Sequence, residues 1–449
     1  MKLKHYLATD SAFIAFFTGL GVIIGTSIDI LIASRYGLSS IADAYFAAIT
    51  FPIIITNAIL FSSQKVLIVS LTRSASDSNS ESIVHGQGSK VFSTLLNAFI
   101  LVGLVISIVG VIASPLLMRL ITPGLNAFSM DTAIEVSKIL YLRIPAASAS
   151  IILQSLLYSR RHVIAGATGN LMPSLVTLVL LISKPALPIQ WVGTSIVIGA
   201  WSGLTWLLIL SSIFQIEKYI PTLDLKNPVI INIGRALLVP LAGLLMRQSI
   251  LIAERWFGSL MGPGYIAAIG YANKIIKVFA GTFFDSLSTA SLPALTIAFS
   301  KKLYENVLKE WRRLLTLSII TGLILSAGIY LISDPFVNFL FSSRVQDIGN
   351  LKLSEMAFIL SIYGISLIPM GPFRAQQSFL YAAKDPKTVG WLLFVATFST
   401  LIFVWPLVNI FGASGLGIAF TIGLCVGLLI GFRSISNHLT RLKILYPQK

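Results

Sequence analysis

The chain has 449 residues, of which 55% are hydrophobic and only 11% are charged. Soluble globular proteins carry about 25% charged residues, so this composition cannot supply a water-exposed surface for the whole chain. The formal net charge of +16 would suggest nucleic acid as the partner of a soluble protein. In a chain that crosses a membrane repeatedly, Lys and Arg in the loops account for it. We therefore expect a membrane protein that contacts lipids and binds no nucleic acid.

Several chemistries are excluded before any helix is considered. The single cysteine, Cys425, has no partner in the chain, which excludes an intrachain disulfide and a cysteine metal site. All four histidines fall in loops or near the termini, a pattern that supports neither a histidine metal site nor a proton relay. The sequence has no G-x-x-x-x-G-K-[ST] loop for nucleotide phosphates. We expect no cofactor, and the energy source is an ion, the membrane potential, the substrate gradient or a partner.

About twelve segments are long and apolar enough to cross a bilayer, for which about 20 residues are needed. In chain order they lie at residues 11–33, 42–71, 91–114, 134–158, 163–183, 191–214, 229–252, 265–299, 314–333, 356–382, 388–410 and 414–433. Lys and Arg outside these segments are concentrated on the side that carries the N-terminus. The positive-inside rule then predicts that both termini are cytoplasmic.

The two halves of the sequence resemble each other. The heptapeptide ILIASRY at 30–36 returns as ILIAERW at 250–256, an offset of 220 residues, and Pro115 and Pro335 repeat at the same offset. Six spans return a chain to its starting side, so the halves would be parallel repeats. We expect an all-α fold with two six-helix lobes, an N-terminal lobe at 1–220 and a C-terminal lobe with a short basic tail at 221–449. Two such lobes around a central cavity favour transport as the function.

Charged residues within the expected spans are the candidate functional residues. One charge at the centre of a lipid-facing helix costs about 2.5–3.5 kcal/mol on insertion scales, so these side chains should face water, protein or each other. The candidate substrate-binding cations are Arg143, Arg247, Lys274, Lys277 and Arg374, and the candidate coupling or cavity acids are Asp29, Asp43 and Asp285. The excess of cations favours an anionic substrate. For each residue alone, snorkelling or structural pairing remains the alternative.

The eighth expected span concentrates three of these residues. Lys274 and Lys277 are three residues apart and project from one face of a helix. Asp285 follows eleven residues after Lys274 on roughly the same side, which allows a charge pair through an intermediate group. This pattern is typical of a helix that lines a cavity.

Two further spans carry helix-bending or helix-packing residues. Prolines and a glycine at 369–372 directly precede Arg374, and a proline bends a helix. This bend is either a gate or a structural kink, and both interpretations stay open. Gly423, Gly427 and Gly431 follow one another at a spacing of four on the last span, which predicts close packing against another helix.

Three segments resemble a known family. ADAYFAAITFP at 42–52, GYANKIIKVFAGTFFDSLSTASLPALT at 270–296 and FLYAAKDPKTVG at 379–390 look like the corresponding parts of the MurJ/MviN lipid II flippases. That family lies within the multidrug/oligosaccharidyl-lipid/polysaccharide exporter superfamily, and the resemblance runs in order from about residue 11 to 433. It implies a flippase of the bacterial cytoplasmic membrane that moves an undecaprenyl-pyrophosphate-linked sugar to the outer leaflet by alternating access.

The resemblance also assigns roles to residues. Asp43 matches an aspartate near the start of the family's second helix, Lys274 a basic residue of the eighth, and Asp29 an acidic residue of the first. Ile28 and Thr56 stand where the family has arginines. The missing basic contacts would have to come from Arg247, Lys277 or Arg374.

Alternatives to lipid II itself remain open. The family usually carries two further helices that help to form a groove for the lipid tail, and here the last expected span ends at 433. A divergent member that handles an exopolysaccharide or O-antigen unit is therefore a comparable expectation, with glycosyltransferases or a polymerase of the cell envelope as candidate protein partners. A drug or small-molecule antiporter shares the fold. An integral membrane polysaccharide enzyme would need larger loops than this chain has, so we expect no enzyme.

Overall fold

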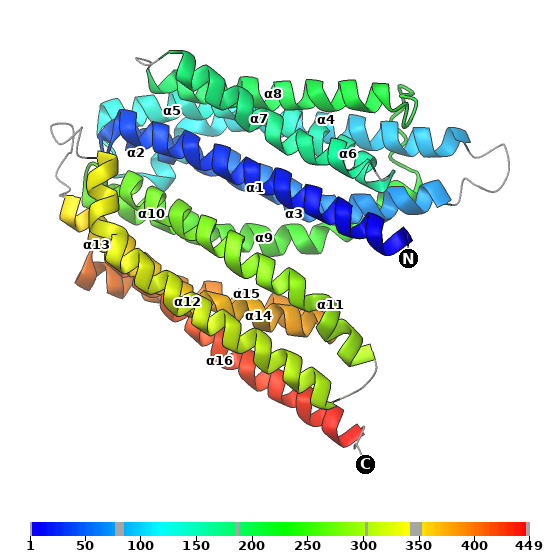
Figure 1. Cartoon of the computed structure of the whole chain (residues 1–449). Helices are drawn as coiled ribbons and strands as arrows, with labels where there is room; N and C mark the ends of the chain where they lie inside the picture. The colour runs from blue at the N-terminus through cyan, green and yellow to red at the C-terminus, as the bar shows by residue number, and fades with distance from the viewer. Residues whose placement is uncertain are drawn as a thin grey trace. The chain divides into compact units, whose positions relative to one another are not determined.

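The computed structural model describes residues 2–76, 85–160, 162–184, 188–300, 304–341 and 353–445, and helices are the only regular secondary structure in these ranges (Figure 1). The first half contains α1 (Lys2–Tyr36), α2 (Ser40–Ala48), α3 (Thr50–Ser76), α4 (His85–Ile121), α5 (Ala127–Tyr141), α6 (Ile144–Ser159), α7 (Val163–Ser183) and α8 (Ile189–Ile213). The second contains α9 (Pro228–Met261), α10 (Tyr265–Phe279), the π-helical turn η2 (Ala280–Asp285), α11 (Ser286–Ser300), α12 (Tyr304–Phe341), α13 (Leu353–Ile365), α14 (Leu367–Ala382), α15 (Pro386–Phe411) and α16 (Ser414–Leu445). The expected all-α class is confirmed.

Ten segments of the described chain are long and apolar enough to cross a membrane. They are 19–36, 40–59, 89–121, 127–159, 163–183, 189–213, 304–341, 353–382, 386–411 and 414–440. The other two expected spans correspond to α9 and to α10 with η2 and α11, which carry half of the candidate charges: Arg247, Lys274, Lys277 and Asp285. A helix of 34 residues such as α9 is about 50 Å long, enough to cross a hydrocarbon core of about 30 Å. The chain is a multi-pass membrane protein, and the count of twelve spans stays a prediction.

The chain divides into two compact units. Unit 1 comprises Met1–Arg35, Ala44–Ile121 and Leu125–Leu245, and unit 2 comprises Tyr36–Asp43, Thr122–Gly124 and Met246–Lys449. Both units use the same series of packed helices. In unit 1, α4 and α3 pack on α6, and α7 packs on α8; in unit 2, α12 and α11 pack on α14, and α15 packs on α16. The lobe boundary between residues 220 and 221 stays a prediction.

Three of the expected spans are interrupted, and another contains an irregular turn. The second breaks at Ile49, the fourth at Leu142 and Arg143, and the tenth at Ser366. At the last of these breaks, the Ser366 hydroxyl donates to the carbonyl oxygen of Tyr363 at 2.6 Å. The eighth span is continuous but contains η2, and such a π-helical turn inserts an extra residue into a helix. Apolar length alone predicts none of these interruptions.

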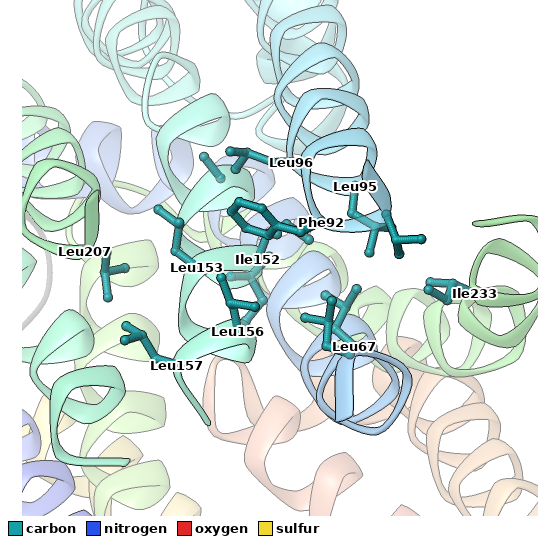
Figure 2. Close-up of a cluster of buried hydrophobic side chains, with 14 of the residues drawn as sticks. Leu67, Phe92, Leu95, Leu96, Ile152, Leu153, Leu156, Leu157, Leu207 and Ile233 are labelled. Carbon is teal, nitrogen blue, oxygen red and sulfur yellow. The ribbon is translucent and has the colours of Figure 1, made fainter. Parts of the chain in front are cut away.

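The core of unit 1 is an apolar cluster that joins six of its helices, α3, α4, α6, α7, α8 and α9 (Figure 2). Leu67 comes from α3, Phe92 and Leu95 from α4, Ile152 from α6 and Leu207 from α8, and all are buried. Burying one such side chain stabilises the fold by about 1.5–3 kcal/mol. Because α6 contributes to this cluster along much of its length, it is the central helix of the unit.

The turn between α1 and α2 is determined by two residues. Gly37 has φ +57°, in the left-handed region that favours glycine. The Ser39 hydroxyl donates to the Tyr36 carbonyl oxygen at 2.7 Å and accepts a bond from the Ala42 amide at 3.3 Å. Ser39 therefore satisfies backbone groups at the end of one helix and at the start of the next.

The expected glycine face of α16 packs as the spacing predicts. A Cβ atom at Gly423 would overlap with Thr400 Oγ1 and the Ala396 carbonyl oxygen of α15. At Gly431 it would overlap with the Gln376 side chain of α14. These glycines allow α16 to approach two neighbouring helices closely.

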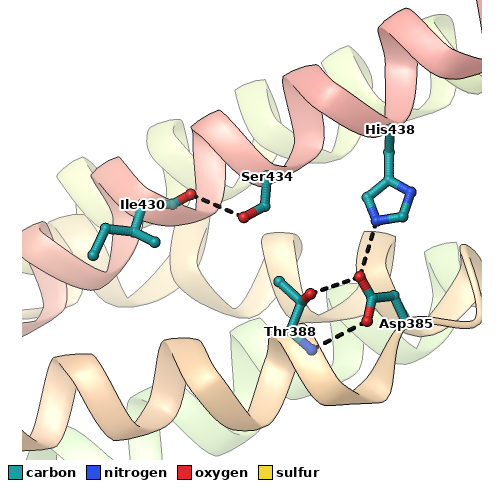
Figure 3. A network of polar contacts seen from close by, with 5 residues as sticks. All are labelled: Asp385, Thr388, Ile430, Ser434 and His438. Atoms are coloured by element: carbon teal, nitrogen blue, oxygen red, sulfur yellow. Dashed lines mark hydrogen bonds and ion pairs between the residues drawn. The ribbon is translucent and has the colours of Figure 1, made fainter.

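Asp385 fastens the start of α15 to α16 (Figure 3). Its carboxylate accepts bonds from the Thr388 amide at 3.1 Å and the Thr388 hydroxyl at 2.6 Å, and it lies 3.0 Å from His438 Nε2. Burial acts to raise the pKa of Asp385, but the hydrogen bonds from Thr388 and His438 outweigh it, so the pKa lies below its usual value. Asp385 therefore acts both as the N-cap of α15 and as a contact between two helices.

Candidate functional site

Four of the five candidate cations lie in unit 2. Arg247 comes from α9, Lys274 and Lys277 from α10, and Arg374 from α14. The fifth, Arg143, lies in unit 1 at the junction of α5 and α6, where its Nε atom is buried. Unit 2 therefore contains the group of cations whose geometry can be described together.

Arg374 and Arg247 share an acidic neighbour. Arg374 Nη1 lies 3.2 Å from Asp285 Oδ1, and both side chains are partly exposed. Arg247 is close enough to be repelled by Arg374 and attracted by Asp285. With Gln377, the two arginines line a pocket of about 50 Å³ whose other walls are mainly apolar residues of α14, α15 and α16. Asp285 therefore pairs with Arg374 on another helix, a partner that spacing along α10 and α11 does not indicate.

Lys277 lies in a strongly positive environment. Its side chain is exposed at the surface of the described structure. Glu254 attracts it, and Arg247, Arg255 and Lys274 repel it. A negatively charged ligand at this position would relieve the repulsion among the cations.

Glu254 and Arg255 are two buried charged residues that the sequence analysis did not identify as candidates. Their exposed fractions are only 3% and 4%. Arg255 Nη1 donates to the Ile266 carbonyl oxygen at 3.0 Å, which links α9 to α10. Both lie in the repeated heptapeptide, where the first copy has Ser34 and Arg35. Glu254 stands in the second copy where the first copy has Ser34, and this difference is the signal in the sequence that could have identified it.

Glu254 is bound by two other helices of unit 2. Asn273 Nδ2 of α10 donates to both carboxylate oxygens, at 2.6 Å to Oε1. The Tyr363 hydroxyl of α13 donates to Oε1 at 3.1 Å. The carboxylate thus joins α9, α10 and α13 next to the cations of α10.

Asp43 caps a helix from a distant part of the chain. It is fully buried, and its carboxylate accepts the Gly264 amide at 2.5 Å and the Ala267 amide at 2.7 Å. These amides belong to the first turn of α10 and the residue before it, where backbone donors lack helical partners. Gly264 has φ +94° and no side chain to supply a cap. Asp43 therefore stabilises the start of the helix that carries Lys274 and Lys277.

The remaining candidate acid and the family's second arginine position lie in unit 1. Asp29 is half-buried on α1, and the buried Thr56 on α3 donates its hydroxyl to the Pro52 carbonyl oxygen at 2.7 Å. Within the described residues, no group of three or more His, Cys, Asp or Glu side chains could hold a metal ion. The ammonium and guanidinium groups of unit 2 can bind an anion electrostatically.

Comparison with known proteins decides the family. The family model described as "Lipid II flippase MurJ" matches residues 32–445, most of the chain. The chain belongs to the MurJ family. Its relatives include a probable lipid II flippase MurJ from Rhizobium tropici, 23% identical over 82% of this chain and 69% of the relative. The lipid II flippase MurJ from Burkholderia cenocepacia is 22% identical over 98% of this chain and 84% of its own length.

Solved structures agree on the fold. A lipid II flippase MurJ in an inward closed conformation matches with a TM-score of 0.77, at 19% identity over 96% of this chain and 90% of its own. An inward-facing multidrug resistance transporter of the MATE family, described as a member of the MOP superfamily, matches with a TM-score of 0.75, at 16% identity over 94% of this chain and 99% of its own. The resemblance to the MurJ/MviN family is thus confirmed. The relatives are named flippases and transporters, so this MurJ family member is not an enzyme.

Proposed function

We propose that the chain moves an anionic lipid-linked saccharide, attached to undecaprenyl pyrophosphate, across the bacterial cytoplasmic membrane by alternating access. Membership of the MurJ family supports a flippase of lipid-linked saccharides. The distribution of Lys and Arg favours cytoplasmic termini. Under this proposal, the ligands are the lipid-linked saccharide and membrane lipids, and cell-envelope glycosyltransferases or a polymerase are candidate partners.

The observation that carries the proposal is the group of cations in unit 2. Arg247 is near Arg374, and Lys277 is near Arg247 and Lys274. A pyrophosphate carries at least two negative charges, and leaving it without cations in a partly dehydrated site is costly. Charge-assisted hydrogen bonds from guanidinium and ammonium groups are the strongest contacts available to it. We assign substrate binding to these four residues. Arg143, which lies in unit 1, is a weaker candidate for the same role.

The saccharide is either that of lipid II or another repeat unit. Ile28 and Thr56 are uncharged where the family has arginines, so the pyrophosphate contacts depend on unit 2. That difference supports an exopolysaccharide or O-antigen unit as strongly as lipid II. Adjacent genes for glycosyltransferases and a polymerase would favour the former, and adjacent cell-wall ligases the latter.

Energy coupling is also part of the proposal. We assign it to a monovalent cation or the membrane potential, with Asp29, Asp43 and Asp285 as the candidate acids and no cofactor. Asp285 is the stronger candidate for a coupling acid than Asp43. The carboxylate of Asp43 accepts hydrogen bonds from two backbone amides, whereas Asp285 is partly exposed beside Arg374. Transport driven in vesicles by an imposed potential, with and without a sodium gradient, separates the two energy sources.

A drug antiporter is the second candidate, because a multidrug transporter of the MATE family shares the fold. An organic cation would need a carboxylate that dominates its site. In unit 2 the exposed and partly exposed charges are mainly cationic. The same electrostatic field that favours a pyrophosphate opposes a cationic drug.

The test replaces Lys274, which combines mid-helix position with the family's basic residue. Lys274→Glu and Lys274→Ala should abolish translocation while expression persists, and Lys274→Arg should retain a substantial part. Arg247→Ala and Arg374→Ala should show weaker defects. Lys138, exposed on α5, provides the matched control as Lys138→Ala. The assay is leaflet-resolved accumulation of the lipid-linked saccharide in cells depleted of their own flippase. Normal transport by Lys274→Glu would refute the cationic site and favour the antiporter.

A further inference from the structure

Glu254 is a buried carboxylate that the proposed contacts with substrate do not use. It lies in the C-terminal part of α9 with 3% of its surface exposed. Transfer of an ionised carboxylate out of water costs several kcal/mol unless hydrogen bonds and nearby cations compensate. The residue in the corresponding position of the first heptapeptide copy is Ser34. Unit 2 therefore keeps a costly charge at a position where an uncharged residue is compatible with the same local sequence.

The hydrogen bonds of Glu254 come from uncharged donors. Asn273 Nδ2 donates to both oxygens, and the buried Tyr363 hydroxyl donates to Oε1. These bonds satisfy the carboxylate oxygens but do not neutralise its charge. The negative charge therefore acts on the neighbouring cations, and Lys277 and Arg255 both experience its attraction.

Asn273 connects this carboxylate with the cationic face of α10. It directly precedes Lys274 and lies four residues before Lys277, so Asn273 and Lys277 project from the same face. A rotation of α10 that moved Lys277 would pull Asn273 away from Glu254. The two bonds from Asn273 thus fix the orientation of the helix that presents the ammonium groups.

We propose that Glu254 is the positioning residue of this phosphate-binding face and that its negative charge weakens phosphate binding enough for release. The inference rests on the proposed function above. A carrier must bind its substrate firmly enough to capture it and weakly enough to release it. Arg247, Lys274, Lys277 and Arg374 together would hold a pyrophosphate tightly, and Glu254, which attracts Lys277, offsets part of their attraction without touching the substrate.

The decisive variant is Glu254→Gln, which removes the charge and keeps the shape. A glutamine oxygen can still accept from Tyr363, and the two amides can pair with each other. The probe is farnesyl pyrophosphate, with farnesol and inorganic pyrophosphate as separate arms, titrated against the purified full chain. We expect Glu254→Gln to bind farnesyl pyrophosphate about tenfold more tightly, which corresponds to about 1.4 kcal/mol. Its translocation rate at saturating substrate should fall.

Two further variants separate charge from structure. Tyr363→Phe removes one hydrogen bond and keeps the charge, so its dissociation constant should change less than about twofold. The double variant Glu254→Gln/Lys277→Met removes one charge of each sign, and its dissociation constant should move back toward that of the unmodified protein. A purely structural role for Glu254 would instead make Tyr363→Phe, which loses a bond to Glu254 and keeps the charge, change the dissociation constant as well.

The outcomes are distinct. Unchanged or weaker binding of farnesyl pyrophosphate by Glu254→Gln, whether the variant folds well or poorly, overturns the inference. So does faster translocation by that variant. If the unmodified protein binds farnesol with the same affinity as farnesyl pyrophosphate, the pyrophosphate does not contribute to binding. That result contradicts the proposed function, and with it this inference. Tighter binding, slower transport and reversal in the double variant support it.

Discussion

Asp43→Ala should destabilise the protein by removing the cap of α10. Two buried amides, those of Gly264 and Ala267, would lose their acceptors. Each buried donor left without a partner costs about 1–3 kcal/mol, so the expected loss is about 3–5 kcal/mol. Asp43→Asn keeps one oxygen acceptor and should cost about 1–2 kcal/mol. Because α10 carries Lys274 and Lys277, transport should fall in the same order.

The assay is thermal unfolding of the purified protein in detergent, followed by the loss of the monodisperse peak in size-exclusion chromatography. The shift in the unfolding temperature per kcal/mol becomes smaller as a protein becomes larger, and a chain of 449 residues should lose about 1 °C per kcal/mol, which predicts a decrease of about 3–5 °C for Asp43→Ala. Asp131→Ala removes an exposed carboxylate from α5 and is the matched control. If Asp43→Ala and Asp131→Ala unfold at the same temperature, the capping argument is wrong.

Two further predictions concern α15 and α16. Gly423→Ala should lower the free energy of unfolding by about 1–3 kcal/mol, because the new methyl group overlaps with the backbone of α15. Gly390 has open space around it, so Gly390→Ala is the control and should be neutral or slightly stabilising in the same unfolding assay. The pKa of Asp385 is lower in the folded protein than in the unfolded chain. Its full contribution to the free energy of unfolding is therefore present above the unfolded pKa of about 3.9, and this contribution is lost as the pH falls through the folded-state pKa. Asp385→Ala should therefore cost about 1 kcal/mol at neutral pH and progressively less in acid, and a deficit that stays constant across the acid range would contradict this assignment.

The sequence predicts the helical class well, because composition and apolar length follow directly from the demands of a bilayer. Spacing also predicts local packing correctly, as the glycines of α16 show at Gly423 and Gly431. These signals depend only on residues close together in the chain.

The sequence does not predict contacts that depend on tertiary structure. Asp285 pairs with Arg374 of another helix, and Asp43 caps a helix more than two hundred residues away. Glu254 was overlooked because a single acidic residue near a helix end resembles a surface charge until its burial is known. Hydrogen bonds from Asn273 and Tyr363 make that burial tolerable, and both partners lie on other helices.

The most direct test of the central claim uses purified protein in vesicles. A fluorescent saccharide linked to undecaprenyl pyrophosphate is placed in both leaflets, and an impermeant quencher reports the outer fraction over time. We predict that the unmodified protein increases the fraction of lipid that becomes accessible to the quencher, that Lys274→Glu does not, and that a cationic dye is not transported. Dye transport without movement of the lipid-linked saccharide, or equal lipid movement by Lys274→Glu, would contradict the account.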